Sequence, residues 1–202
     1  MKLLVATRSV GKQKEVRRVL EQQGHEVVFP DDVGIYLDPS EERLELSDSF
    51  ETNAREKAQY FAKRSGLPTV ADDSGLEVLS LGGAPGVRSK RWAGASGTPA
   101  EVDAANNAEL LRRLAGAAPS RRRARYRCLI ALMRGTTAIP EIFSGECGGV
   151  ILEAPRGSGG FGYDPLFLSD ELQKTFGEAT AEEKDGVSHR GRALAKLVAA
   201  LG

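Results

Sequence analysis

The sequence predicts an α/β protein in which a long mixed β-sheet is flanked by helices. Residues 2–29 follow the order strand, helix, strand, which is the opening of a parallel α/β arrangement. Residues 124–152 then form two long strand-like segments around one turn, and such a hairpin adds antiparallel strands to the sheet. The composition, 41% hydrophobic and 28% charged over 202 residues, is that of a globular protein with a sizeable core.

The first third of the chain predicts two strands and two helices. The apolar segments 2–6 and 26–29 are expected to be strands on either side of a helix over 12–22. The acidic, irregular stretch 30–47 predicts a loop. A second helix is expected from Asp48 to about residue 65, because Asp48 and Glu51 have the spacing of a capping box.

The middle third predicts a strand pair and a capped helix. Residues 67–81 read as two strands separated by a Ser-Gly turn. A helix is expected to begin at Thr98, because Pro99 suits its first position and Glu101 completes a capping box. That helix should end near Gly116, since glycine commonly follows the last helical turn.

The last third predicts the long hairpin and two helices. Strands are expected over 124–134 and 138–152, a short helix near 169–176 and a final helix over 188–201. No segment has the composition of a linker, so we expect a single domain over residues 1–202.

Charge and cysteine usage favour a cytoplasmic protein without a polyanionic or membrane partner. The charges of the 28 basic and 28 acidic side chains cancel, whereas a protein that binds nucleic acid or a membrane surface requires an excess of positive charge. The apolar run Leu3–Ala6 is too short for a signal peptide, and no segment reaches the roughly 18 apolar residues of a membrane span. Cys128 and Cys147 lack metal-ligand spacing and are expected to be buried free thiols.

Two nucleotide-binding motifs are matched only in part. Gly157, Gly159 and Gly162 fit the G-x-G-x-x-G pattern, but Pro165 disfavours the helix that must follow it. The stretch ATRSVGKQ resembles a P-loop without its first glycine and its magnesium-binding hydroxyl. It still places a strand end before a helix N-terminus, which can bind phosphate. An ordinary capped helix is the alternative.

Three other patterns could carry chemistry. Asp72 and Asp73 follow an apolar strand, where they could hold a hard cation or simply cap a turn. Because neighbouring strand residues face opposite sides, only one of the two can point into a given site. His189 and Arg190 begin the final helix and could recognise a base or a phosphate, or be exposed. Five arginines between residues 121 and 127 favour a solvated loop over a nucleic-acid contact.

Seven segments occur together in an order that resembles the Ham1-like inosine triphosphate pyrophosphatases. They are ATRSVGKQKE, FETNAREKA, ADDSGLEV, GGAPGVRSKRWAG, SGECGGVI, GGFGYDPLF and EEKDGVSHRGRAL. The resemblance implies Mg²⁺-dependent hydrolysis of ITP, dITP or XTP to the monophosphate and pyrophosphate, which removes damaged purines from the nucleotide pool. It also implies a long mixed sheet, two lobes around a central cleft and a homodimer.

The same resemblance assigns roles to individual residues. Asp73 corresponds to the catalytic proton acceptor and, with Glu45, to the metal ligands. The residues expected to contact the nucleoside triphosphate are Thr7, Arg8, Ser9, Val10, Gly11, Lys12, Lys57, Ser74, Phe161, Gly162, Tyr163, Asp164, Lys184, His189 and Arg190. Two departures from the family pattern are Ser9, which replaces the usual asparagine, and Leu46-Ser47, which replaces a glycine-containing stretch after Glu45.

The residue types fit this chemistry. Lys12, Lys57 and the helix N-terminus would stabilise the phosphates, and Phe161 or Tyr163 would stack on the base. Arg190 or backbone donors would select a 6-keto purine by donating to O6. The alternatives are a pyrophosphatase with Maf-like specificity for other modified nucleotides and, less favoured, a nucleic-acid-binding module that uses the arginines.

Overall fold

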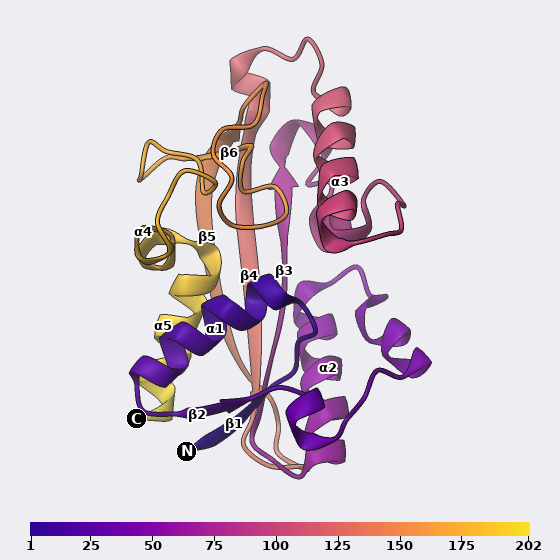
Figure 1. Ribbon diagram of the computed structural model, residues 1–202, viewed down its shortest axis with the longest axis vertical. Helices are drawn as coiled ribbons and strands as arrows, with labels where there is room; N and C mark the ends of the chain where they lie inside the picture. The colour runs from indigo at the N-terminus through magenta and orange to yellow at the C-terminus, as the bar shows by residue number, and fades with distance from the viewer. The chain divides into compact units, whose positions relative to one another are not determined.

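The mixed α/β fold is confirmed by the computed structural model, which describes residues 1–202 except the side chain of Glu42. Six strands form one sheet in the order β2-β1-β3-β4-β5-β6 (Figure 1). The strands are β1 (Lys2–Val5), β2 (Glu26–Val28), β3 (Thr69–Val78), β4 (Arg123–Met133), β5 (Glu141–Ile151) and β6 (Phe167–Ser169). The α-helices are α1 (Val10–Gln22), α2 (Phe50–Ser65), α3 (Pro99–Arg113), α4 (Ala181–Val187) and α5 (His189–Leu201).

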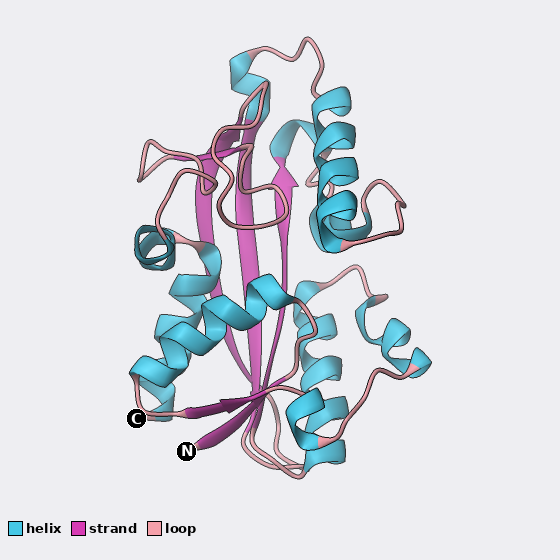
Figure 2. Ribbon diagram, viewed as in Figure 1, coloured by secondary structure: helices cyan, strands magenta, loops and turns pink.

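The sheet contains both strand orientations. β1 pairs in parallel with β2 and β3, whereas β5 and β6 pair antiparallel. The neighbours β4 and β5 are joined by residues 134–140 alone, a connection too short for parallel strands. The predicted opening strand-helix-strand unit and the later long hairpin are both present (Figure 2).

The chain divides into two compact units. Unit 1 comprises Met1–Asp73, Cys128–Gly145 and Arg190–Gly202, and unit 2 comprises Ser74–Arg127 and Glu146–His189. Two units match the two lobes that the resemblance implies. The cleft and the description of residues 1–202 as one domain stay predictions.

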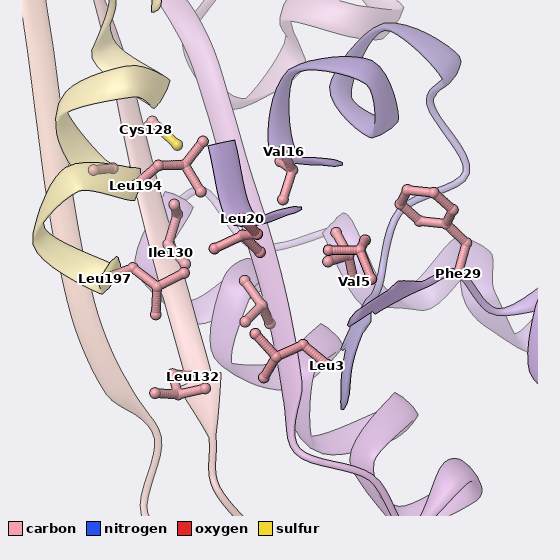
Figure 3. Packing of buried hydrophobic residues seen from close by; sticks show 13 residues of the cluster. Leu3, Val5, Val16, Leu20, Phe29, Cys128, Ile130, Leu132, Leu194 and Leu197 are labelled. Carbon is pink, nitrogen blue, oxygen red and sulfur yellow. The ribbon is translucent and has the colours of Figure 1, made fainter. Parts of the chain in front are cut away.

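The core of unit 1 has two apolar clusters, one on each face of its strands. Leu3 and Val5 of β1 pack with residues of α1 and α5, whereas Leu4 packs with α2. This split follows from strand geometry, because successive side chains point to opposite faces. Figure 3 shows the first cluster, in which Leu20 of α1 and Ile130 of β4 are among the labelled side chains. Both faces of β1 are buried, which explains its unbroken apolar run.

The core of unit 2 forms between α3, its strands and the segment 163–176. Leu110 and Leu114 of α3 belong to the same cluster as Leu76 and Val78 of β3. The predicted cap of α3 is confirmed, since the Thr98 hydroxyl accepts from the Glu101 N–H and the Glu101 carboxylate accepts from the Thr98 N–H. Three aromatic rings, those of Tyr126, Phe167 and Phe176, pack at centroid distances of 4.8 to 6.1 Å.

The Ser-Gly turn predicted within 67–81 is wrong, because β3 runs unbroken through Ser74 and Gly75. Gly75 is required there by close packing: a Cβ atom would lie 2.2 Å from the carbonyl oxygen of Gly86. A glycine that admits a neighbouring backbone has the same appearance in sequence as a glycine that permits a turn.

Other element boundaries also differ from the predictions. The cap of α2 is Ser49 and not Asp48, because the Ser49 hydroxyl accepts from the Thr52 N–H. The predicted helix near 169–176 is replaced by β6 and a turn, whereas α4 was not predicted. The stretch 30–47 includes two short 3-10 helices. Both cysteines are buried free thiols as predicted, and burial raises the pKa of Cys128 to about 12.

Two isoleucines of unit 1 provide a matched test of this core. Ile130→Ala removes a side chain that is fully buried, so we expect a loss of about 2–5 kcal/mol in the free energy of unfolding. Ile139→Ala changes a side chain that is 87% exposed and should cost less than about 0.5 kcal/mol. Urea unfolding measures both values, and equal losses would contradict the described core.

Candidate functional site

The turn between β1 and α1 has the geometry of a capped helix N-terminus. The Ser9 hydroxyl accepts from the Lys12 N–H at 3.5 Å, and the Thr7 hydroxyl accepts from the Ser9 N–H at 3.2 Å. Thr7 is buried, Ser9 and Gly11 are half-buried, and Val10 is exposed. Ser9 therefore caps the helix, a role that an asparagine could also fill. The capped turn and a phosphate site are compatible, because capping uses one of the several N–H groups at the helix start.

Arg8 is directed at the segment that follows β2. Its guanidinium donates to the Glu41 carboxylate at 2.7 and 3.0 Å, to Asp31 at 2.7 Å and to the carbonyl of Ile35 at 2.9 Å. Four hydrogen bonds to this segment occupy all three nitrogens of the side chain. The backbone of Arg8 remains part of the predicted phosphate-binding turn, whereas its side chain anchors residues 31–41.

Asp72 is the centre of a buried ionic network in unit 1. Its carboxylate lies 3.0 Å from the Lys12 ammonium and 3.3 Å from two guanidinium nitrogens of Arg190. The third nitrogen of Arg190 donates to Glu15 of α1. Burial alone would raise the pKa of Asp72, but the cations Lys12 and Arg190 outweigh it and hold the pKa well below its usual range. Asp72 is therefore ionised, and its carboxylate is engaged in ion pairs with Lys12 and Arg190.

Asp73 faces the other side of β3. Its carboxylate accepts from the Asn53 amide of α2 at 2.8 Å. Asn53 is fully buried and also exchanges two hydrogen bonds with the backbone of Ser47, at 3.0 and 3.1 Å. One side chain thus holds both Asp73 and the segment that directly follows Glu45. Burial raises the pKa of Asp73, and the nearby Glu45 carboxylate raises it further.

Glu45 and Lys57 form an ion pair at the same place. The Lys57 ammonium lies 2.5 Å from the Glu45 carboxylate and lowers the pKa of Glu45 to about 2. Burial lowers the pKa of Lys57, but the carboxylates of Glu45, Asp72 and Asp73 outweigh this effect and raise it. Lys57 is thus a charged ammonium beside three carboxylates. Lys57 lies one helical turn after Asn53, which places both side chains on the same face of α2.

Glu45 and Asp73 could hold a divalent cation, although the donor set is small. Among the described residues, no three His, Cys, Asp or Glu side chains form a group able to hold a metal. Two carboxylates nevertheless suit Mg²⁺, which proteins commonly bind through one or two carboxylates together with substrate phosphates. The donor chemistry therefore fits Mg²⁺ bound with a phosphate ligand better than a resident metal in a full protein cage.

In unit 2, the Phe161–Asp164 loop is held by a buried ion pair. The Lys184 ammonium lies 2.5 Å from the Asp164 carboxylate and 4.9 Å from the centroid of the Phe161 ring. The same carboxylate accepts from the Phe161 N–H at 2.8 Å, which closes the turn on itself. Phe161 and Gly162 are half-buried. Three predicted site residues are thus in direct contact.

Tyr163 and His189 belong to the interior of unit 2. Tyr163 is 3% exposed, and its hydroxyl donates to the carbonyl of Ser89 at 2.8 Å. The His189 ring is buried and stacks on Tyr126 at a centroid distance of 4.6 Å. Of the two rings proposed to stack on a base, Phe161 is therefore the more accessible. Ser74 lies half-buried on β3.

The arginine run before and within β4 is tied into unit 2. Arg122 is buried and donates to the carbonyls of Leu114, Ile151 and Leu152. Ion pairs of the run join Arg123 to Asp170, Arg125 to Glu77 and Glu146, and Arg127 to Glu77. Because these guanidinium groups already have acidic or carbonyl partners, the run is poorly suited to neutralise nucleic-acid phosphates.

The structure thus groups the predicted residues into two sets. Lys12, Glu45, Lys57, Asp73 and Arg190 lie in unit 1, and the Phe161–Asp164 loop with Lys184 and His189 lies in unit 2. The sequence prediction missed Glu15 and Asn53. Their helical spacing was a usable signal, since Glu15 is three residues after Lys12 and Asn53 four residues before Lys57.

Comparison with known proteins decides the family. The sequence profile of the Ham1 family matches residues 3–200. The chain belongs to the Ham1 family. Among curated relatives, a dITP/XTP pyrophosphatase from Frankia alni is 45% identical and covers 100% of this chain and 97% of its own. One from Haemophilus influenzae is 44% identical over 97% of this chain and 96% of its own.

Solved structures agree with this family assignment. A Ham1 protein from Coxiella burnetii superimposes with a TM-score of 0.84 at 36% identity, over 100% of this chain and 98% of its own. The nucleoside-triphosphatase / dITP/XTP pyrophosphatase from Mycobacterium abscessus gives a TM-score of 0.73 at 45% identity, over 98% of both chains. The Ham1 fold therefore extends over essentially the whole sequence.

The buried network predicts a pH-dependent cost for losing Arg190. Arg190→Met leaves Asp72 and Glu15 without their guanidinium, so we expect a loss of about 3–5 kcal/mol in unfolding free energy at neutral pH. The lowered pKa of Asp72 stabilises the native protein above the unfolded pKa, and this stabilisation fades as the pH falls. The deficit should therefore persist down to about pH 4, the ordinary pKa of an aspartate, and shrink as the pH falls below it.

Arg134→Met is the matched control, because Arg134 is an exposed arginine of unit 1 paired with Glu141. It should leave the unfolding midpoint nearly unchanged at both pH values. Urea unfolding of both variants at neutral and acidic pH measures the difference. A deficit in Arg190→Met that does not change with pH would contradict the ionic role of the network.

Proposed function

We propose that this chain hydrolyses the non-canonical purine nucleoside triphosphates ITP, dITP and XTP to the monophosphate and pyrophosphate. The observation that carries the proposal is the cluster in unit 1, where Lys12 and Lys57 lie beside Asp73 and Glu45. Family membership and relatives named as dITP/XTP pyrophosphatases support it. The physiological role would be to remove these nucleotides from the pool.

The phosphate chain is bound by the cations of unit 1. Lys12 and Lys57 are charged donors, and the N–H groups at the start of α1 add a favourable dipole. Both lysines are held in place by carboxylates, and the carboxylates around Lys57 raise its pKa. Phosphoryl transfer requires mainly positioning and charge compensation, and fixed cations provide both without reorganisation. Arg190 acts on this site indirectly, because it holds Asp72 and Asp72 holds Lys12.

Asp73 is the proposed proton acceptor for the attacking water. Its raised pKa makes it a stronger base than an ordinary aspartate, while the neighbouring cations Lys12 and Lys57 favour the ionised form. Asn53 orients the carboxylate by donating a hydrogen bond to one of its oxygens. The water would then attack the α-phosphorus with pyrophosphate as the leaving group.

Glu45 and Asp73 are the residues proposed to hold Mg²⁺ together with the substrate phosphates. Mg²⁺ bound there would neutralise charge on the phosphate oxygens. Glu45 is well suited because its pKa of about 2 keeps it ionised at neutral pH. Its ion pair with Lys57 places an anion and a cation at the site.

The base is proposed to bind at the Phe161–Asp164 loop of unit 2. Phe161 is the stacking ring, because Tyr163 is buried and its hydroxyl is already bonded to Ser89. Backbone donors of unit 2 are favoured over Arg190 as the contact to O6, since all three guanidinium nitrogens of Arg190 donate to carboxylates. A 6-amino purine would present a donor to these donors and be rejected.

The resemblance also supports a cytoplasmic homodimer, which we propose as the working state. No helix in the described chain combines the length and apolar character needed to cross a membrane. Tyr36 and Leu37 are each 74% exposed and are the largest neighbouring apolar side chains available to a second copy.

A substrate panel tests the proposed reaction. With Mg²⁺, we expect pyrophosphate from dITP, ITP and XTP, and turnover of dATP lower by about 100-fold or more, because its 6-amino group presents a donor to the donors that meet O6 and leaves buried polar groups unpaired. Chelation of the metal should abolish product formation. Equal turnover of dATP, release of orthophosphate alone, or a preference for modified pyrimidines would each contradict the proposal.

Asp73→Asn separates catalysis from stability. Loss of the base should lower kcat by about 10²–10⁴-fold with little change in KM. The folded protein disfavours the ionised carboxylate, because burial raises its pKa above that of the unfolded chain; this cost is present at neutral pH and vanishes at low pH. The variant should therefore be at least as stable as the parent at neutral pH without metal.

Steady-state kinetics and thermal unfolding of Asp73→Asn measure these two effects. Asp170→Asn serves as the control, since Asp170 is an exposed aspartate paired with Arg123. It should retain activity. Full activity in Asp73→Asn, or a loss of activity that parallels unfolding, would refute the assigned role.

A further inference from the structure

Both polar backbone groups of Gly162 are bound by side chains of α3. The Gly162 N–H donates to the Asp103 carboxylate at 2.7 Å, and the Gly162 carbonyl accepts from the Asn107 amide at 2.9 Å. Asp103 and Asn107 are four residues apart on α3, so they lie on the same face of the helix one turn apart. All of these groups belong to unit 2. Two side chains thus hold one glycine from both ends.

The backbone conformation of Gly162 shows what its two hydrogen bonds to Asp103 and Asn107, here called the Gly162 clamp, hold in place. Its φ of +62° lies in the left-handed region, where residues with a Cβ atom are strained. A Cβ atom at Gly162 would meet no heavy atom within 4 Å, so space does not require the glycine. The backbone conformation requires it, and the two hydrogen bonds from α3 fix that conformation.

The other contacts of the loop hold different residues. Asp164 is tied to Lys184 and to the Phe161 N–H, and the Tyr163 hydroxyl is tied to Ser89. Phe161 adjoins Gly162, so the peptide orientation at Gly162 controls the direction in which the chain leaves the phenylalanine. The helix that supplies the clamp is well anchored, with a complete capping box at Thr98.

The hydrogen bond to Gly162 also determines how the side-chain amide of Asn107 is oriented. The remaining carbonyl oxygen of the Asn107 side chain is buried and has no hydrogen-bond partner among the described residues. The contact to Gly162 is therefore the one that fixes the orientation of the Asn107 amide. Asn106, the preceding residue, holds a different segment through Ala93 and Lys90. Adjacent asparagines of α3 thus fix two separate loops.

We propose that Asp103 and Asn107 are positioning residues that set the purine selectivity of the enzyme by fixing Gly162 and hence the Phe161–Asp164 loop. This inference rests on the proposed function, in which that loop holds the base. Neither side chain needs to contact the substrate. Their effect is on base recognition in unit 2, and it leaves the phosphate-binding residues of unit 1 unchanged.

A pair of isosteric variants gives an asymmetric expectation. Asp103→Asn keeps an oxygen that accepts from the Gly162 N–H, so kcat/KM for dITP should change by no more than about threefold. Asn107→Asp replaces the donor with a carboxylate that faces the Gly162 carbonyl. We expect its KM for dITP to rise by about tenfold or more, kcat to change less, and the preference for dITP over dATP to fall. Asn107→Ala, which keeps a good helix former, should change in the same direction.

The controls separate positioning from stability. Inhibition by inorganic tripolyphosphate, which has no base, should be unchanged in all variants. Glu109→Gln alters an exposed ion pair on the same helix and should leave KM and selectivity unchanged. Thermal unfolding of each variant accompanies the kinetics. If Asn107→Asp does not fold, the higher KM expected of Asn107→Ala can still be compared with the small change expected of Asp103→Asn.

Three outcomes would overturn the inference. One is an unchanged KM and dITP preference in folded Asn107→Asp and Asn107→Ala. Another is an equal effect of Asp103→Asn and Asn107→Asp, which would indicate a general role of the helix. The last is weaker binding of tripolyphosphate in parallel with dITP. Failure of the proposed function is a different result, because the parent protein itself would then show no pyrophosphate release or no base preference.

Discussion

The alternation of side chains along β3 is the constraint on which the charged cluster of unit 1 depends. Asp72 and Asp73 are adjacent at the end of an apolar run, and the strand directs them to opposite faces. Asp72 meets Lys12 and Arg190, while Asp73 meets Asn53. The Asp72 carboxylate is therefore ionised and paired with cations, while the Asp73 carboxylate has a raised pKa. Two adjacent aspartates thus have different environments and opposite pKa shifts.

A chain of zero net charge can therefore contain a strongly charged local cluster, where the proposed function places the phosphates. Charge is sorted locally, so that lysines and carboxylates of unit 1 alternate within one cluster. The carboxylates around Lys57 raise its pKa in a buried setting that would by itself favour loss of the proton. By contrast, four of the five arginines of the run are tied to carbonyls, Glu77 and Asp170.

Unit 2 uses hydrogen bonds where unit 1 uses charge. Apart from the Lys184–Asp164 pair, the Phe161–Asp164 loop is shaped by backbone contacts at Gly162 and by the buried Tyr163. Directional hydrogen bonds suit recognition of a base, since a misplaced donor leaves a polar group unpaired. Electrostatic attraction suits phosphates, because it tolerates small displacements. The two units therefore use the type of interaction that matches the part of the nucleotide assigned to each.

The sequence by itself determined the α/β fold, the order of most elements, the cap at Thr98 and the opposite directions of Asp72 and Asp73. These features follow from local periodicity and capping, which depend on residues a few positions apart. The resemblance added the family and the candidate residues. Only the tertiary structure decided the partners of the charged side chains: Arg190 binds Glu15, which is 175 residues away, and Asn53 holds Asp73. It also placed the Gly86 carbonyl against Gly75, which explains a glycine inside a strand that runs unbroken where the sequence predicts a turn. Contacts between residues distant in sequence leave no local pattern, so no reading of a single chain could have assigned them.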